Sequence, residues 1–78
     1  MPVAFVLIDV SPSYESEVLN KLSKIPEVIE LHSLFGKYDF IAKIDAKDYE
    51  SIGEIVILKI RKIDSIKNTS TLIELKFH

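Results

Sequence analysis

The segment IDVSPSYES at residues 8–16 returns as IDAKDYES at residues 44–51. A second pair of similar segments follows in the same order, KIPEV at residues 24–28 and KIDSI at residues 62–66. Each half of the chain therefore predicts the same succession of a strand, a turn, a helix and a second strand. Two such halves give the order β-α-β-β-α-β, which is typical of the ferredoxin-like α+β fold.

The first half contains clear element boundaries. The run at Val3–Val10 is rich in valine and isoleucine and predicts a strand. Ser11 is expected to cap the first helix, with Pro12 at the first helical position. Pro26 ends this helix. Spacings of four, four and three residues place Tyr14, Val18, Leu22 and Ile25 on one helix face.

Two strands in the middle of the chain, Val28–Phe35 and Tyr38–Asp45, are predicted to form a hairpin. Gly36-Lys37 between them suits a two-residue type II′ turn, because glycine adopts the positive φ that the first central position needs. The hairpin makes these strands antiparallel neighbours in the sheet.

The second helix is expected to begin at Asp48, a favourable N-cap residue. The β-branched run at residues 55–58 also permits a strand, but the apolar pattern continues to Ile63, and this length favours a helix. A last strand is expected at Ile66–Phe77. The apolar face of the second helix comprises Tyr49, Ile52, Val56, Ile60 and Ile63.

Both faces of the predicted four-stranded antiparallel sheet carry apolar side chains. Two helices cover one face, and a solvated second face would be largely polar. We therefore expect a second copy to pack on it, as in a dimeric α/β barrel, with Phe5 or its neighbours opposite Ile73 and Phe77. The alternative is a monomer with an unusually apolar sheet. The alternating sets are Val3, Phe5 and Leu7 against Ala4, Val6, Ile8 and Val10 in the first strand, Tyr38, Phe40, Ala42 and Ile44 against Ile41 in the third, and Thr71, Ile73, Leu75 and Phe77 against Leu72 in the fourth.

The chain has 78 residues, which suffices for one domain over residues 1–78. A domain of this size buries only about 60% of its unfolded surface, so self-association is expected to add stability. The absence of cysteine excludes disulfides and thiolate metal sites and favours a cytoplasmic location. Lys and Arg number 10 against 12 Asp and Glu, and this net charge of -2 argues against direct binding to nucleic acid or anionic membranes.

Few residues are suited to catalysis. His32 and His78 are the only histidines, and no acidic residue or cysteine accompanies them at metal-ligand spacing. Gly36 and Gly53 are the only glycines, so no phosphate-binding loop is present in the sequence. No serine lies in a nucleophile-elbow motif. We therefore expect no enzymatic activity, no cofactor and no metal.

Two polar segments remain, Gly36–Asp39 at the hairpin tip and Asn68–Thr71 at the start of the last strand. On a functional interpretation, Asp39 binds an ammonium group, while hydroxyls of the second segment bind a carboxylate; these groups are the two ends of a free amino acid. On a structural interpretation, the glycine forms the turn and the aspartate caps it. The hydroxyls belong to Thr69, Ser70 and Thr71.

Three features follow one another along the chain: Val28, the motif Gly36-x-Tyr38-Asp39, and the motif Ile66-x-x-Thr69-x-Thr71-x-Ile73-x-Leu75. Together they resemble the RAM domain (regulation of amino-acid metabolism), the C-terminal effector-binding domain of Lrp/AsnC-family transcriptional regulators. The resemblance covers essentially all 78 residues. Family regulators carry an N-terminal helix-turn-helix, whereas this sequence begins at the first RAM strand. The resemblance is therefore to stand-alone RAM modules, for which no direct DNA binding is expected.

The resemblance implies a homodimer of apposed sheets, assembled into rings such as octamers or decamers. It also implies that a small amino acid binds between dimers near the hairpin. The function implied is that of a non-enzymatic effector-binding and oligomerisation module that modulates full-length Lrp/AsnC-type regulators. The effector-site candidates are Gly36, Tyr38, Asp39, Thr69, Ser70 and Thr71.

Two other functions remain open. A small dimeric α+β-barrel monooxygenase would share the sheet-dimer architecture and would need a polar pocket on the sheet, for example around His32; the scarcity of histidine and the absence of tryptophan argue against it. A purely structural assembly module would need no ligand site.

Overall fold

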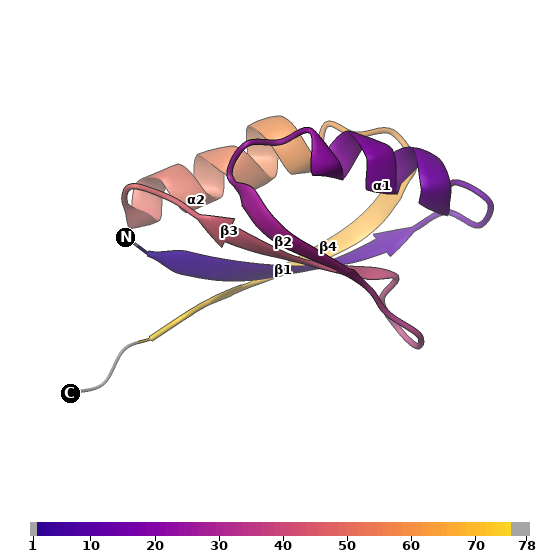
Figure 1. Cartoon of the computed structure of the whole chain (residues 1–78), viewed down its shortest axis with the longest axis horizontal. Helices are drawn as coiled ribbons and strands as arrows, with labels where there is room; N and C mark the ends of the chain where they lie inside the picture. The colour runs from indigo at the N-terminus through magenta and orange to yellow at the C-terminus, as the bar shows by residue number, and fades with distance from the viewer. Residues whose placement is uncertain (1, 76–78) are drawn as a thin grey trace.

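The structure, a computed structural model, describes residues 2–75 and has the element order βαββαβ. The four strands form one antiparallel sheet in the order β2-β3-β1-β4. Both helices lie on the same face of this sheet (Figure 1). The ferredoxin-like architecture predicted from the sequence is confirmed. The elements are β1 (Val3–Val10), α1 (Glu15–Ser23), β2 (Val28–Ser33), β3 (Phe40–Asp45), α2 (Tyr49–Ile55), a π-helical continuation η1 (Val56–Ile60) and β4 (Ile66–Ile73).

The core lies between the sheet and the helices. Side chains of β1 alternate between half-buried and buried along the whole strand. Those of β3 follow the same alternation, because opposite residues of antiparallel strands share a face. The buried residues are Ala4, Val6, Ile8 and Val10 from β1, Phe40, Ala42 and Ile44 from β3, Val18 and Leu22 from α1, Ile25 and Ala46 from the connections, and Ile52, Ile55, Val56 and Ile60 from α2 and η1.

The first helix begins later than the sequence indicates. α1 starts at Glu15, after a turn in which the Tyr14 N–H donates to the Ser11 carbonyl at 3.2 Å. Pro12 and Ser13 are the central residues of this turn, and Ser13 has a φ of 77°, as the third residue of a type II turn requires. The predicted Ser11 N-cap is therefore wrong. Proline at the second position stabilises the turn because its own φ is already restricted.

Two tyrosines predicted on the apolar helix faces are exposed instead. Tyr14 is 47% exposed and Tyr49 is 61% exposed. Tyr14 is the N-cap residue of α1 and Tyr49 is the first residue of α2. Both side chains therefore lie at the N-terminal end of a helix, where they are exposed to solvent and do not pack in the core.

The connection between β2 and β3 is wider than a two-residue turn. β2 ends at Ser33 and β3 begins at Phe40, so the predicted type II′ turn at Gly36-Lys37 is replaced by a loop of residues 34–39. The Leu34 N–H donates to the Asp39 carbonyl at 2.8 Å and closes this loop. Gly36 has a φ of 134°, so the requirement for glycine is confirmed.

The second helix begins at its predicted cap. The carboxylate of Asp48 accepts a hydrogen bond from the Ser51 N–H at 2.8 Å. The helix then widens into η1, where the Arg61 N–H donates to the Val56 carbonyl at 2.8 Å, a spacing of five residues. The ambiguous β-branched run is thus helical. Its apolar side chains at Ile57 and Leu58 are more than half exposed.

The last strand pairs with β1 in a register that the sequence does not reveal. A bulge between Asp9 and Val10 shifts the pairing, and a shift of one residue moves side chains to the opposite face. As a result, Ile73 pairs with Ala4 on the helix side, while Leu72 pairs with Phe5. The prediction that Ile73 faces the same side as Phe5 is wrong, and Phe77 lies outside the described residues.

We call the sheet face away from the helices the open face. Every second residue of β1 lies on this face, together with the residues that pair with it in β3 and β4. None of its apolar side chains is fully buried in the described part of the chain. These side chains are Val3, Phe5, Leu7, Ile41 and Leu72.

Truncation of a core side chain should cost far more than the same change on the helix surface. Leu22 is fully buried, so Leu22→Ala should lower the free energy of unfolding by about 2–5 kcal/mol. Leu19→Ala removes the same atoms from the same helix at a side chain that is 38% exposed, and should cost much less. Urea denaturation followed by circular dichroism measures both values. Equal losses would contradict this assignment of the core.

Acid should destabilise the fold through its paired carboxylates. Lys59 Nζ donates to both carboxylate oxygens of Glu27, at 2.9 and 2.7 Å, and this hydrogen bond lowers the pKa of Glu27 below its ordinary value of 4.5. A carboxyl whose pKa is lower in the folded state contributes stability above its unfolded pKa and loses that contribution as pH falls through the folded pKa. The free energy of unfolding should therefore decline as pH falls below about 4.5, and Glu27→Gln should make the decline shallower. Unfolding measured at several pH values tests this, and an unchanged slope in the variant would contradict it.

Candidate functional site

The topology brings three segments to one end of the molecule. β1 and β2 run in the same direction, so both end where α1 begins and where the loop 34–39 turns back into β3. This is the right-hand end of the molecule in Figure 1. Residues far apart in the sequence meet there.

A hollow of about 350 Å³ opens at this end, and we call it the Asp39 hollow. It combines two carboxylates, two hydroxyls and three apolar side chains. No basic side chain lines it. Its lining residues are Glu15, Ser16 and Leu19 from α1, with Ser33, Leu34, Asp39 and Phe40 from the β2–β3 region.

Asp39 is held by three hydrogen bonds to neighbouring backbone. Its carboxylate Oδ2 accepts from the Val10 N–H at 2.8 Å, and its own N–H donates to the Ile8 carbonyl at 2.8 Å. Its carbonyl closes the loop to Leu34. The side chain thus has the structural role of tying the loop to β1, while the bond through Oδ2 leaves Oδ1 for a further donor.

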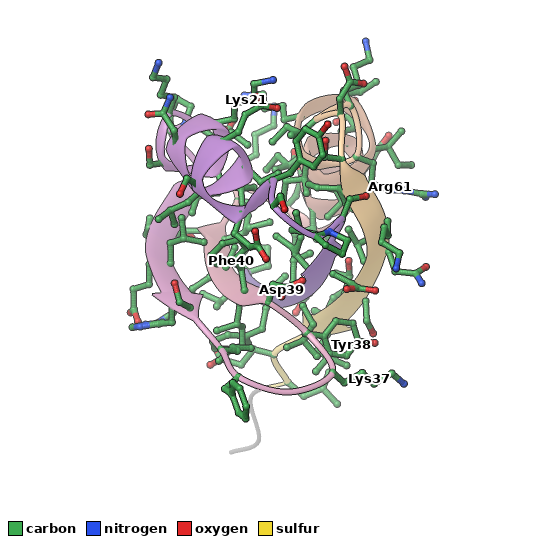
Figure 2. The ribbon with its side chains drawn as sticks, turned by 90° about the vertical axis from the view of Figure 1, so that its right-hand side faces the viewer. Lys21, Lys37, Tyr38, Asp39, Phe40 and Arg61 are labelled. Carbon is green, nitrogen blue, oxygen red and sulfur yellow. The ribbon has the colours of Figure 1, made fainter. Side chains whose placement is uncertain are left out.

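The other two predicted hairpin residues lie outside the lining of the Asp39 hollow. Gly36 is exposed and supplies the positive φ of the loop. Tyr38 is half-buried, and Lys37 Nζ lies 5.7 Å from the centre of its ring. Figure 2 shows Lys37 at the rim of the loop and Asp39 and Phe40 further towards the helices.

The predicted hydroxyl residues of β4 lie on the other side of the central strand. Thr69 pairs with Ile8, whose opposite neighbour is Phe40, so two strand spacings of roughly 5 Å each separate Thr69 from Phe40. Thr71 is exposed on the same strand face, while Ser70 pairs with Leu7 and therefore faces the open side. The structure does not bring these three residues to the Asp39 hollow of the same chain.

The N-terminus of α1 contributes backbone donors to this end of the molecule. Its N-cap residue, Tyr14, makes no side-chain hydrogen bond to the first turn. The first amides of a helix lack partners within the helix and carry a partial positive charge. An anionic group in the hollow could accept from them, and a cationic group could bind the carboxylates of Glu15 and Asp39.

A charged network crosses the open face beside its apolar residues. Lys43 Nζ donates to Glu30 at 3.4 Å and lies 6.0 Å from the centre of the Phe5 ring. His32 Nε2 lies 3.2 Å from the other oxygen of Glu30. Hydrogen bonds from His32 and then Lys43 lower the pKa of Glu30. Apolar and charged groups thus lie side by side on the open face.

A second hollow of about 380 Å³ lies at the opposite end of β3, and we call it the Glu27 hollow. The Glu27–Lys59 ion pair forms part of its wall. Its lining includes basic as well as acidic side chains, unlike that of the Asp39 hollow. Its other lining residues are Asp45, Ala46, Lys47, Ser51, Glu54, Ile55 and Leu58.

The described residues contain no cluster of three His, Cys, Asp or Glu side chains that could hold a metal ion. His32, the histidine considered for a monooxygenase pocket, lines neither of the two hollows. Across residues 2–75, none of the helices has both the length and the apolar character needed to cross a bilayer.

Comparison with known proteins agrees with this architecture. Residues 3–78 match the family model of the Lrp/AsnC ligand binding domain. The HTH-type transcriptional regulator FL11 of Pyrococcus furiosus is 37% identical over 76 residues, which are 97% of this chain and 50% of FL11. The chain thus spans about half the length of the curated relatives it matches.

Two solved structures are similar to nearly the whole chain. FFRP-DM1 is 36% identical with a TM-score of 0.91, and the match covers 96% of this chain and 100% of FFRP-DM1. AsnC of E. coli is 30% identical with a TM-score of 0.91, over 97% of this chain and 52% of AsnC. The family model, the sequence identity and the shared fold agree, and the chain belongs to the Lrp/AsnC ligand-binding (RAM) domain family.

Proposed function

We propose that the chain is a non-enzymatic, cytoplasmic module that binds a small amino acid and modulates Lrp/AsnC-type transcriptional regulators through assembly. The observation that carries this proposal is the position of Asp39. Its carboxylate is oriented by the Val10 N–H at 2.8 Å and lines a hollow that contains a second carboxylate and no cation. Such a site suits the ammonium group that every free amino acid carries.

The hollow offers partners for each part of an amino acid. The ammonium group lies between Asp39 and Glu15, and the carboxylate accepts from the first amides of α1 and from Ser16. The apolar side chains on its wall contact the ligand side chain. A volume of about 350 Å³ lies in the range of small-molecule sites. The apolar residues are Leu19, Leu34 and Phe40.

The other proposed effector-site residues do not line the Asp39 hollow. Gly36 and Tyr38 shape the loop that presents Asp39. The hydroxyl residues of β4 lie across β1 from the hollow, so any contact they make with the ligand requires a second chain. Those residues are Thr69, Ser70 and Thr71.

We further propose that the open face packs against the same face of a second copy. Its apolar side chains remain accessible in the single chain, and burying them would add the stability that a domain of this size lacks. Sheet dimers of this kind are proposed to join into rings. A ligand that binds one assembly state more tightly shifts the equilibrium towards that state.

A purely structural assembly module is the second candidate. The observation in its favour is that the Asp39 carboxylate already has a structural partner in Val10. In a purely structural module the hollow binds no effector, so thermal unfolding measured with each of the twenty amino acids distinguishes the two candidates.

One or more of the twenty amino acids should raise the thermal unfolding midpoint of the chain, since a ligand that binds only the folded state stabilises it. Asp39→Asn should abolish most of this shift and weaken binding by roughly 10- to 100-fold, because the amide oxygen still accepts from Val10 while the negative charge is lost. Asp48→Asn is the matched control, since it removes a charge from another capping aspartate outside the hollow. Calorimetry measures the affinities.

Asp39→Ala should behave differently from Asp39→Asn. It leaves the Val10 N–H without its partner, which should cost about 1–3 kcal/mol of stability in addition to the loss of binding. Unchanged affinity in Asp39→Asn would show that the site is wrongly assigned. If no amino acid stabilises the wild type, the structural candidate replaces the proposed function.

A charge placed on the open face should dissociate the sheet dimer. Leu72 is 55% exposed in the single chain, so Leu72→Glu should fold normally but oppose burial of the face in a dimer. Leu58→Glu, at a side chain that is 54% exposed on the helix layer, is the matched control. Sedimentation analysis at micromolar concentration should show smaller assemblies for Leu72→Glu only. Equal assembly of both variants and the wild type would refute the sheet contact.

A further inference from the structure

Four exposed residues form a row along one side of the second helix. Each is four residues from the next, and this spacing places them on the same side of a helix. Within residues 2–75 no other element covers them, and Tyr49 and Ile57 are 61% and 58% exposed. We call this set the outer row; it comprises Tyr49, Gly53, Ile57 and Arg61.

The π-helical turn keeps the outer row straight. In an α-helix every fourth residue lies slightly beyond one full turn, so a row with this spacing drifts around the helix. In η1 the Arg61 N–H donates to the Val56 carbonyl, five residues back, and in this wider turn four residues fall short of a full turn. The drift is thereby reversed between Ile57 and Arg61. Figure 2 shows Arg61 on the side of this helix that is turned away from α1.

Gly53 weakens the helix without a reason inside the single chain. It lies within α2, where glycine is less favourable than alanine because its backbone loses more freedom on folding. A Cβ at this position would meet no atom within 4 Å, and the φ of Gly53 is not positive. The chain alone therefore does not need glycine here, whereas a second helix that approaches this backbone closely does.

The outer row is complementary to itself when a second copy of the helix runs in the opposite direction. A two-fold axis midway between Gly53 and Ile57 places Ile57 of each copy at Gly53 of the other. The same axis places Tyr49 of each copy at Arg61 of the other, and a guanidinium group packs favourably on an aromatic face. The row thus supplies both members of each pair.

The charges near the row favour the same orientation. Residues 47–54 contain three acidic residues and one lysine, whereas residues 57–64 contain three basic residues and one aspartate. Of these basic residues, Lys59 is already paired with Glu27, while Arg61 takes part in no ion pair within residues 2–75. Antiparallel helices bring the acidic half of each copy opposite the basic half of the other. A second copy is therefore the favoured occupant, since one chain carries both complementary halves.

We propose that the outer row is a contact between two copies of this chain, in which antiparallel helices pack with Ile57 over Gly53. This contact is separate from the open face, because the helices and the open face lie on opposite sides of the sheet (Figure 1). The row spans about 18 Å of helix, so the contact is small and weak by itself. None of its residues lines the Asp39 hollow, and the contact needs no ligand.

Cysteine cross-linking tests the pairing, because the chain has no cysteine of its own. Equimolar Gly53→Cys and Ile57→Cys chains, oxidised together, should form the mixed disulfide in excess over random pairing, since a disulfide needs Cα atoms roughly 5–6 Å apart. The mixed pair also keeps one native contact of Ile57 with Gly53. Leu58→Cys in place of Ile57→Cys is the matched control at the next residue, 54% exposed, and should give only the random share. A random share for both mixtures overturns the proposal.

A charge on the row should weaken the contact. Ile57→Glu should raise the concentration needed for association roughly tenfold or more, because the carboxylate loses water at the contact, while Leu58→Glu should not change it. Both changes are made in the Leu72→Glu chain, so that the open face contributes little. Sedimentation at concentrations up to about 1 mM measures the association. Equal association of the two variants, or a larger effect of Leu58→Glu, contradicts the contact.

Gly53→Ala should have two opposite effects. The methyl group should raise the thermal unfolding midpoint of dilute chains but weaken association roughly tenfold, because it occupies the position of Ile57 from the second copy. Asn20→Ala, at an exposed site inside α1, is the matched control, which also improves helix propensity but should leave association unchanged. Gly53→Ala chains that are more stable and associate as before overturn the proposal. So does binding of the row to a helix of an Lrp/AsnC-type regulator without any association of the chain itself. A failed amino-acid screen affects only the proposed function.

Discussion

The hydrogen bond from the Val10 N–H to the Asp39 carboxylate joins the end of the central strand to the loop 34–39. A second bond, from the Asp39 N–H to the Ile8 carbonyl, holds the backbone of the same residue. Together they fix Asp39, the last residue of the loop and part of the hollow's lining, to the end of β1. The same carboxylate is the proposed partner of the ligand ammonium, so the residue that organises the site also supplies its charge.

The features of the fold that the sequence predicted correctly depend on residues that are close together in the sequence. The cap at Asp48, the alternation of β1 and the need for glycine at position 36 all follow from local pattern. The start of α1 and the face of Ile73 depend instead on contacts made at a distance. The turn before α1 reaches back across the end of the sheet, where the Ser11 N–H donates to the Ser65 carbonyl, and the register of β4 is shifted by a bulge opposite β1.

The candidate site was predictable in part for the same reason. Asp39 stands in a short motif, so the sequence alone singles it out. Ser33 shares its hollow but stands in no motif, and the repeated segment that contains Glu15 gives no sign that this residue lies beside Asp39. Their proximity follows from chain direction, since α1 begins where β1 and β2 end. The three hydroxyl residues of β4 divide between the two faces, as in any strand, and β1 separates them from the Asp39 hollow. This strand order is not revealed by the residue types.

The open face and the loop 34–39 point in different directions on the same small domain. Two such surfaces on one chain, each in contact with the same surface of another copy, would place the chain on two dyads that do not coincide. Assemblies built in this way have dihedral symmetry and an even number of chains, and the angle between the dyads determines how many chains close the circle. One twisted four-stranded sheet carries both surfaces, so its twist sets their relative orientation. A small change in strand twist, such as a bulge like the one between Asp9 and Val10 introduces, would therefore reorient the loop 34–39 relative to the open face without changing either surface.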